Sequence, residues 1–253
     1  MINKEKKTIL ITGAATGIGA ATARALSYNK SNLILTTGSN EEDLENICDE
    51  VKNNGSEVLK IVGDLSDENF ITELIKEIRK NNFKIDQFVS NAGFADRKQF
   101  LEFKKSDLHK AINTMLFPFN SIIEEFFNDI EKSHCGRIVA VSSFVNKNIG
   151  INNNIFPTTA AAKSALEALV KTLAFQFAKY NVTVNCVSPG FTKKQSHHSA
   201  LTQLEWDKVI NSIPIKRLAN PIDIASTIKF LLSDDASYIT GQIIKIDGGL
   251  SLL

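Results

Sequence analysis

The strongest chemical signal in the sequence is a glycine-rich turn near its start. A short apolar run, Thr8–Thr12, leads into Gly13-Ala14-Ala15-Thr16-Gly17-Ile18-Gly19, and a helical pattern follows. Small residues let a backbone turn sharply and approach a pyrophosphate, and the following helix presents unpaired N–H groups and its positive end to that anion. Because the glycines lie between a strand and a helix, the spacing favours a dinucleotide site over a plain tight turn.

Strands and helices must alternate along the chain to position this turn. The expected strands are the short apolar runs 8–12, 32–37, 57–62, 86–90, 137–142, 183–188 and 242–246. The expected helices cover residues 20–28, 41–53, 67–81, 106–131, 157–180 and 222–233. Such repetition, with nearly continuous apolar strands, is typical of a parallel sheet covered by helices on both faces. We therefore expect an α/β fold: a single doubly wound Rossmann-type domain over residues 1–253.

Ligands of such sheets bind at the carboxyl ends of the strands, and a polar segment leaves that edge after Pro189-Gly190. We expect a substrate loop around residues 191–210. His197 and His198 lie in it and titrate near neutral pH, so they are candidate acids. Polar loop residues are usually solvated, which favours the simpler interpretation that both are exposed.

Composition excludes several classes of protein. The chain has 253 residues, 43% of them hydrophobic, and a net charge of +1, which argues against a disordered chain or a nucleic-acid or membrane-surface partner. No apolar stretch approaches the roughly 20 residues that span a bilayer. The three cysteines are far apart and do not cluster with the four histidines, so we expect no metal site and a cytoplasmic location.

Further motifs follow in chain order: Asp64-Leu65, Asn91-Ala92-Gly93, Asn113, Ser142-Ser143, residues 185–190, Thr240-Gly241-Gln242 and Asp247-Gly248-Gly249. Together they make the chain similar to the short-chain dehydrogenase/reductase family over nearly its whole length. The resemblance implies that Ser143 polarises a carbonyl, that Asn113 positions a water, and that Lys163 binds the cofactor ribose and supplies positive charge. The cofactor site that it implies, together with the glycine turn, comprises Gly13, Thr16, Gly17, Ile18, Gly19, Ser39, Asp64, Leu65, Asn91, Ala92, Gly93, Lys163, Pro189, Gly190 and Thr192.

The catalytic tyrosine of the family is missing. The family places a tyrosine four residues before its lysine, and here that position is Thr159; counting forward from Ser143 reaches Phe156 instead. Hydride transfer to a carbonyl builds an alkoxide that needs a proton, and an aliphatic hydroxyl is a far weaker acid than a phenol of pKa ~10. Loss of a positioned acid typically costs about 10²–10⁴-fold in rate. We therefore interpret Thr159 as a relay or a spacer in the catalytic site.

The end of the second expected strand bears on the choice of cofactor. A site that prefers NAD usually carries Asp or Glu there to bind the ribose hydroxyls, and residues 36–40 contain neither. The hydroxyls of Ser39 and Thr16 can receive a phosphate, and the missing carboxylate removes a repulsion. NADP(H) is therefore slightly favoured over NAD(H).

The resemblance implies an NAD(P)-dependent oxidoreductase acting on a 3-oxoacyl group or related ketone, either a small molecule or linked to an acyl carrier. Two alternatives remain open. One is a cofactor-binding protein without dehydrogenase activity, such as a regulatory or partner subunit; the other is altered, non-redox chemistry in the same pocket. The family's habit and the surplus of apolar residues in 106–131 and 157–180 predict a homo-oligomer, a tetramer or a dimer.

Overall fold

The computed structural model describes residues 6–28, 31–99, 101–151, 154–193 and 202–252. These residues form a parallel sheet of seven strands in the order β3-β2-β1-β4-β5-β6-β7. The strands are β1 Thr8–Ile11, β2 Asn32–Thr37, β3 Val58–Val62, β4 Gln87–Ser90, β5 Arg137–Val141, β6 Thr183–Pro189 and β7 Ile243–Ile246. The strand order reverses between β1 and β4, and this doubly wound order creates a crevice at the carboxyl ends of the strands.

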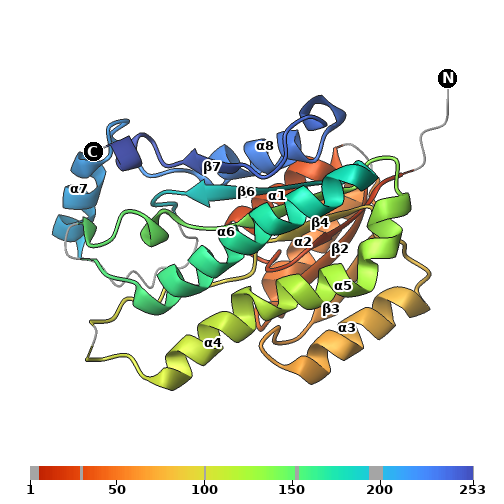
Figure 1. Ribbon diagram of the computed structural model, residues 1–253, viewed down its shortest axis with the longest axis horizontal. Helices are drawn as coiled ribbons and strands as arrows, with labels where there is room; N and C mark the ends of the chain where they lie inside the picture. The colour runs from red at the N-terminus through yellow and green to blue at the C-terminus, as the bar shows by residue number, and fades with distance from the viewer. Residues whose placement is uncertain (1–5, 29–30, 100, 152–153, 194–201, 253) are drawn as a thin grey trace.

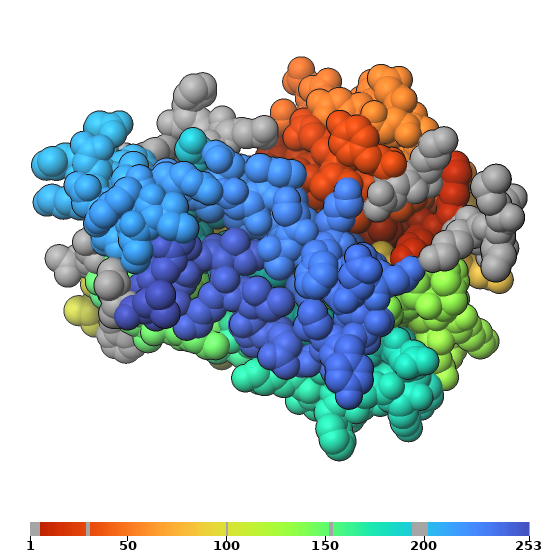
Figure 2. Space-filling model, turned by 90° about the horizontal axis from the view of Figure 1, so that it is seen from above, coloured from red at the N-terminus to blue at the C-terminus, as the bar shows by residue number. Residues whose placement is uncertain are grey.

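Helices cover both faces of the sheet (Figure 1). They are α1 Gly17–Ser27, α2 Glu41–Asn53, α3 Glu68–Lys80, α4 Lys105–Met115, α5 Phe117–Lys132, α6 Pro157–Phe177, α7 Gln203–Ser212 and α8 Pro221–Leu231. Short 3-10 turns are η1 Phe144–Asn146, η3 Ala178–Tyr180, η4 Asp234–Ala236 and η5 Leu250–Leu252. One core packs α3, α5 and α6 on the sheet, and a second packs α1, α2 and α8 on the opposite face. Figure 2 shows α8 (blue) beside the α1 and α2 region (red to orange) on that second face.

Strand β5 illustrates why the strands are apolar at most positions. Ile138 and Ala140 belong to the first core, whereas Val139 and Val141 belong to the second. Successive side chains of a strand point to opposite faces, so a strand covered on both sides favours apolar residues at consecutive positions.

The seven expected strands are confirmed to within a residue or so at their ends, but the expected helix over 106–131 is wrong. The segment forms α4 and α5, which break at Leu116. Pro118 lies in the first turn of α5, where its missing N–H costs nothing because first-turn N–H groups have no helical partner. Two further differences are smaller: α1 begins at Gly17 instead of residue 20, and α7 occupies part of the segment 191–210.

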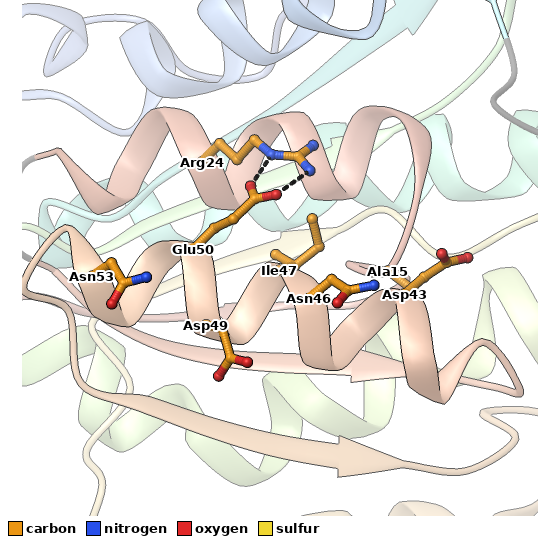
Figure 3. A pocket seen from close by; sticks show the side chains of 8 residues that line it. All are labelled: Ala15, Arg24, Asp43, Asn46, Ile47, Asp49, Glu50 and Asn53. Carbon is orange, nitrogen blue, oxygen red and sulfur yellow. Dashed lines mark hydrogen bonds and ion pairs between the residues drawn. The ribbon is translucent and has the colours of Figure 1, made fainter.

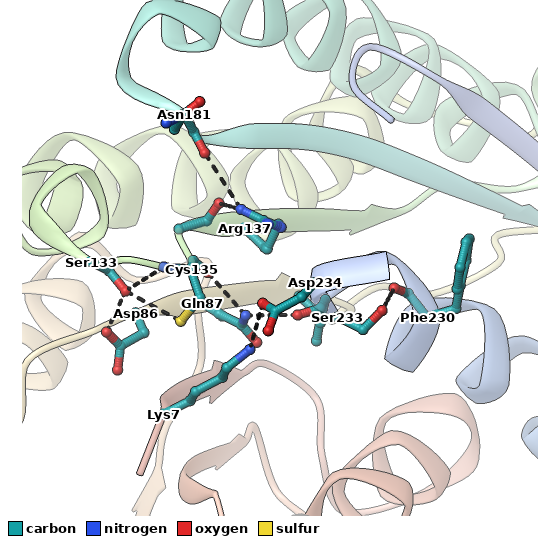
Figure 4. Close-up of polar contacts among 12 residues, drawn as sticks. Lys7, Asp86, Gln87, Ser133, Cys135, Arg137, Asn181, Phe230, Ser233 and Asp234 are labelled. Carbon is teal, nitrogen blue, oxygen red and sulfur yellow. Dashed lines mark hydrogen bonds and ion pairs between the residues drawn. The ribbon is translucent and has the colours of Figure 1, made fainter. Parts of the chain in front are cut away.

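A buried polar network closes the sheet at the amino ends of the strands, opposite the expected site (Figure 4). Gln87, which is 1% exposed, donates through Nε2 to the carbonyl oxygens of Cys135 at 3.0 Å and Leu232 at 2.8 Å. Next to it, the N–H of Thr8 donates to Oδ2 of Asp86 at 2.7 Å. These bonds fasten the start of β1 and the end of α8 to the centre of the sheet.

Candidate active site

The glycine turn has room for nothing larger than hydrogen at two positions. A Cβ added at Gly13, which has a φ of +65°, would lie 2.9 Å from the Cα of Ala92. A Cβ at Gly19 would lie 2.1 Å from the carbonyl oxygen of Gly13. The turn therefore packs directly on the segment that follows β4, and a larger residue at Gly19 must displace backbone.

Asn91 holds the turn in this shape. Its Nδ2 donates to the carbonyl oxygens of Thr12 at 3.0 Å and Gly13 at 2.9 Å, and Thr12 Oγ1 accepts from the N–H groups of Asn91 and Ala92 at 3.0 and 3.1 Å. Thr16, the N-cap of α1, makes no capping bond with its side chain. The first N–H groups of α1 are thus left to an anion, which fits the pyrophosphate of a dinucleotide.

Lys163 projects from α6 toward the carboxyl ends of β4 and β5. Only 5% of the residue is exposed, and its Nζ donates to the carbonyl oxygen of Val141, the last residue of β5, at 2.6 Å. A Cβ at Gly93 would lie 3.2 Å from this Nζ, so the glycine makes room for the ammonium group. Burial lowers the pKa of Lys163 to about 8, because the charged form loses its hydration.

Thr159 lies one turn before Lys163, and its hydroxyl is already used. Its Oγ1 donates to the carbonyl oxygen of Phe94 at 3.3 Å and accepts from the N–H of Asp96 at 3.0 Å. Thr158 reinforces the contact by donating from Oγ1 to Oδ2 of Asp96 at 3.3 Å. The single proton of the Thr159 hydroxyl therefore fastens α6 to the segment after β4.

Ser143 and Asn113 lie on neighbouring elements of the same edge. Ser143 follows β5, is half-buried, and caps η1 by accepting from the N–H of Val145 at 3.4 Å. Asn113 lies in α4, which packs on α6 and on the segment after β4 through the cluster formed by Ala111, Ile112, Met115, Ala162 and Phe94. The structure thus brings the elements that carry the four expected catalytic residues to one edge of the sheet.

An apolar cluster adjoins the Ser143 turn. The ring centroids of Phe144 and Phe191 lie 4.5 Å apart with the planes tilted by 51°, and the Phe191 centroid lies 6.4 Å from that of Trp206 on α7. Phe156, the second candidate for the tyrosine position, also packs here. This wall of side chains suits an apolar substrate better than a charged one. His197 and His198 lie outside the described residues.

The remaining cofactor candidates differ in their surroundings. Gly190 packs on Asp247, whose Cα would be 2.7 Å from an added Cβ, and Thr192 donates from Oγ1 to the Gly190 carbonyl oxygen at 3.1 Å. Ser39 is exposed at the end of β2. The Leu65 side chain, however, is 8% exposed and packs in the first core, so what it offers a ligand at this edge is its backbone.

A hollow of about 550 Å³ lies between α1 and α2 (Figure 3). It is lined by Ala15 of the glycine turn and by residues of the two helices that are polar except for Ile47; among them Arg24 and Glu50 form an ion pair with two hydrogen bonds. This hollow is on the face of the sheet that α1 and α2 cover, opposite α6, so it does not belong to the site around Lys163.

Sequence reasoning missed one charged residue near the site, Glu167. It lies one turn after Lys163 on α6 and is 5% exposed. The available signal was a single carboxylate in an otherwise largely apolar helical segment, since a carboxylate on the buried face of a helix is almost never without a partner. Among the described residues no group of three or more His, Cys, Asp or Glu side chains is arranged to hold a metal ion, and none of the described helices is long and apolar enough to cross a membrane.

Known proteins share this architecture over their whole length. A family model described as enoyl-(acyl carrier protein) reductase matches residues 13–251. The 3-oxoacyl-(acyl-carrier-protein) reductase FabG of Rickettsia conorii is 35% identical, with 100% of each chain covered. The NADPH-dependent reductase YwfH has a TM-score of 0.87 at 25% identity, with 97% of this chain and 98% of that one covered. A putative NAD(P)-dependent gluconate 5-dehydrogenase from Beutenbergia cavernae, with bound NADP, has a TM-score of 0.88 at 25% identity, covering 98% and 97%. The chain therefore belongs to the short-chain dehydrogenase/reductase family of oxidoreductases.

Proposed function

We propose that the protein is an NADP(H)-preferring reductase of 3-oxoacyl groups or related ketones, with the substrate free or linked to an acyl carrier. The observation that carries this proposal is the Lys163 ammonium group, which is buried where Gly93 leaves room for it. A buried cation at the ligand-binding edge of an α/β sheet is well placed to bind a polar group of a ligand.

The residues of the glycine turn fit a dinucleotide. Gly13, Gly17 and Gly19 would hold its pyrophosphate with the N-terminus of α1, and Lys163 would hold a ribose. Bound there, a nicotinamide would supply the hydride. The NADP preference rests on the hydroxyls of Ser39 and Thr16 and on the missing carboxylate. The NADPH dependence named for YwfH and the NADP bound to the Beutenbergia protein agree with it.

The side chains divide the remaining chemistry. The Ser143 hydroxyl donates a hydrogen bond to the substrate carbonyl oxygen, and Asn113 orients a water. The Lys163 Nζ, with its pKa near 8, both supplies positive charge and exchanges a proton near neutral pH. Of the two roles considered for Thr159, relay or spacer, it acts as the spacer, because its hydroxyl is already hydrogen-bonded to the segment after β4.

The bonds of Thr159 also favour a second candidate function. With the phenol absent and the threonine proton occupied, the chain could bind the cofactor without dehydrogenase activity, as a regulatory or partner subunit. The two candidates differ in turnover and agree on cofactor binding.

The deciding experiment measures both properties. Binding of NADPH and NADH is followed by fluorescence. Turnover is followed by the loss of absorbance of the reduced cofactor, with 3-oxoacyl thioesters and small ketones as substrates. Turnover that favours NADPH and falls in Ser143→Ala supports the reductase. Binding without turnover on any ketone supports the second candidate, and no binding of either cofactor refutes both.

The assembly and location complete the proposal. Exposed aromatic residues lie on helices within the two segments, 106–131 and 157–180, that have a surplus of apolar residues. Phe117 on α5 is 53% exposed, and Phe175 on α6 is 88% exposed. We infer a homo-oligomer, a tetramer or dimer, and light scattering that shows a monomer at micromolar concentration refutes it. The three cysteines are free and buried, which agrees with a reducing cytoplasmic location.

A further inference from the structure

Glu167 forms two polar contacts that reach across to a different part of the chain. Its Oε1 accepts a hydrogen bond from the Ser142 hydroxyl at 2.8 Å in a buried environment. Its Oε2 pairs with Nζ of Lys147 at 3.3 Å, and the Glu167 side chain is only 7% exposed. Both partners of this carboxylate lie on the segment between β5 and α6.

These two contacts bracket Ser143. Ser142 precedes the serine directly, and Lys147 follows η1, the turn that Ser143 caps. Within the bracket the chain bonds to itself, because the N–H groups of Lys147 and Asn148 both donate to the carbonyl oxygen of Phe144, at 3.1 and 3.0 Å. One side chain of α6 thus grips both ends of a short turn.

The same helix carries Lys163 one turn earlier, so a grip from Glu167 fixes the turn relative to the ammonium group. An ion pair at the surface is worth little, but a buried carboxylate that loses a partner leaves an unsatisfied charge. The hydrogen bond from Ser142 is therefore strongly favoured once Glu167 is buried, whereas the ion pair with Lys147, whose side chain is 45% exposed, is the weaker of the two contacts.

We propose that Glu167 is a positioning residue that fixes the Ser143 turn, and so the Ser143 hydroxyl, against the Lys163 side of the site by holding Ser142 and Lys147. The role of Ser143 in turnover rests on the proposed function, whereas the anchoring of the turn does not. Both of these contacts of Glu167 are with the chain itself.

Three variants separate the two contacts. Glu167→Leu removes both, Glu167→Gln keeps an oxygen for Ser142 and removes the ion pair, and Lys147→Met removes the ion pair from the other side. Val170→Ala is the matched control, because Val170 is fully buried one turn further along α6 and packs in the first core. It lowers stability without touching the turn.

Two readouts are needed: kcat and KM for ketone reduction, and amide hydrogen exchange at Lys147 and Asn148. We expect Glu167→Leu to lower kcat about 10-fold or more, as misplacement of a catalytic group does, with the dissociation constant of NADPH unchanged. Exchange at the two amides should rise in the same variant. Glu167→Gln and Lys147→Met should fall between it and the wild type, and Val170→Ala should change thermal stability alone.

The outcomes decide the proposal in each case. Wild-type kcat and wild-type exchange at these amides in Glu167→Leu overturn it, as does an equal effect of Val170→Ala. If Glu167→Leu does not fold, unchanged exchange in both Glu167→Gln and Lys147→Met overturns it. If the wild type reduces no ketone but exchange rises in the variants as expected, the anchoring stands and the proposed function fails.

Discussion

Replacing Lys163 by methionine should stabilise the protein, although it removes the group that the site requires. Methionine has nearly the same length and no charge. Burial lowers the lysine pKa from 10.5 to about 8, and this difference corresponds to about 3 kcal/mol of cost for holding the ammonium group in the folded state. The methionine variant avoids this cost, but it also loses the hydrogen bond to the Val141 carbonyl oxygen, which lowers its stability by about 1 kcal/mol. We therefore expect the free energy of unfolding to rise by about 2 kcal/mol at pH 7.

The sign of the pH dependence makes the test specific. Above pH 8 the folded lysine releases its proton while the unfolded one keeps it until about pH 10.5, so the unfolded state binds more protons in that window. The wild type should therefore gain stability relative to Lys163→Met as the pH rises from about 8 toward 10.5, and the advantage of the variant should vanish there. Below pH 8 the difference should be constant.

The assay is urea unfolding of both proteins without cofactor at pH 7, 8, 9 and 10. Lys171→Met is the matched control, because Lys171 is an exposed lysine on the same helix and its removal should leave stability nearly unchanged. A difference between wild type and Lys163→Met that stays constant from pH 7 to pH 10 refutes the reasoning. So does a variant less stable than the wild type at pH 7.

Three further predictions follow from the packing and the polar contacts. Gly19→Ala should weaken NADPH binding at least about 10²-fold in a fluorescence titration, because the added Cβ would lie 2.1 Å from the Gly13 carbonyl oxygen. The control is Gly38→Ala, which should bind NADPH normally because a Cβ at Gly38 has no atom within 4 Å. Thr159→Val should lower the free energy of unfolding by about 1–3 kcal/mol, because the hydrogen bonds to Phe94 and Asp96 are lost, and should leave kcat within a few-fold. Thr159→Tyr should raise the rate of ketone reduction about 10²-fold or more if the site has simply lost its acid. A large loss of kcat in Thr159→Val would show that the threonine hydroxyl takes part in the reaction. Gln87→Leu should lower the free energy of unfolding by about 2–4 kcal/mol in urea, since two buried carbonyl oxygens lose their donor, and kcat of the folded fraction should not change.

The fold could be predicted because its signals are local. Residues 9–11 and 138–141 are unbroken apolar runs, and each strand contributes alternate side chains to the two cores. The helix break at Leu116 could not be read in the same way. The apolar pattern continues through Leu116, Phe117 and Pro118, and a proline in a first turn looks like a proline inside a helix until the break itself is known.

The site divides along the same line. Gly19 was predictable, because the close approach that requires it, to the Gly13 carbonyl oxygen, lies within the turn itself. Gly13 was predictable from its place in the glycine motif, although the backbone that it meets, at Ala92, is far away in the sequence. The role of Glu167 was not, because Ser142 lies 25 residues away in the sequence and the contact forms only when α6 packs on the sheet. The Thr159 contacts with Phe94 and Asp96 span more than sixty residues and were hidden for the same reason.

Because of the break at Leu116, α4 and α5 differ in the free energy that local unfolding costs. Helix α4 buries Ala111 and Met115, whereas α5 buries six residues, three of them isoleucines. Local unfolding costs least where few apolar contacts are lost, so α4 can open as a small cooperative unit while α5 stays closed with the sheet. Because Asn113 lies in α4, a ligand that contacts it transfers part of its binding free energy into ordering that helix, and slower hydrogen exchange in α4 alone would then report occupancy of the site.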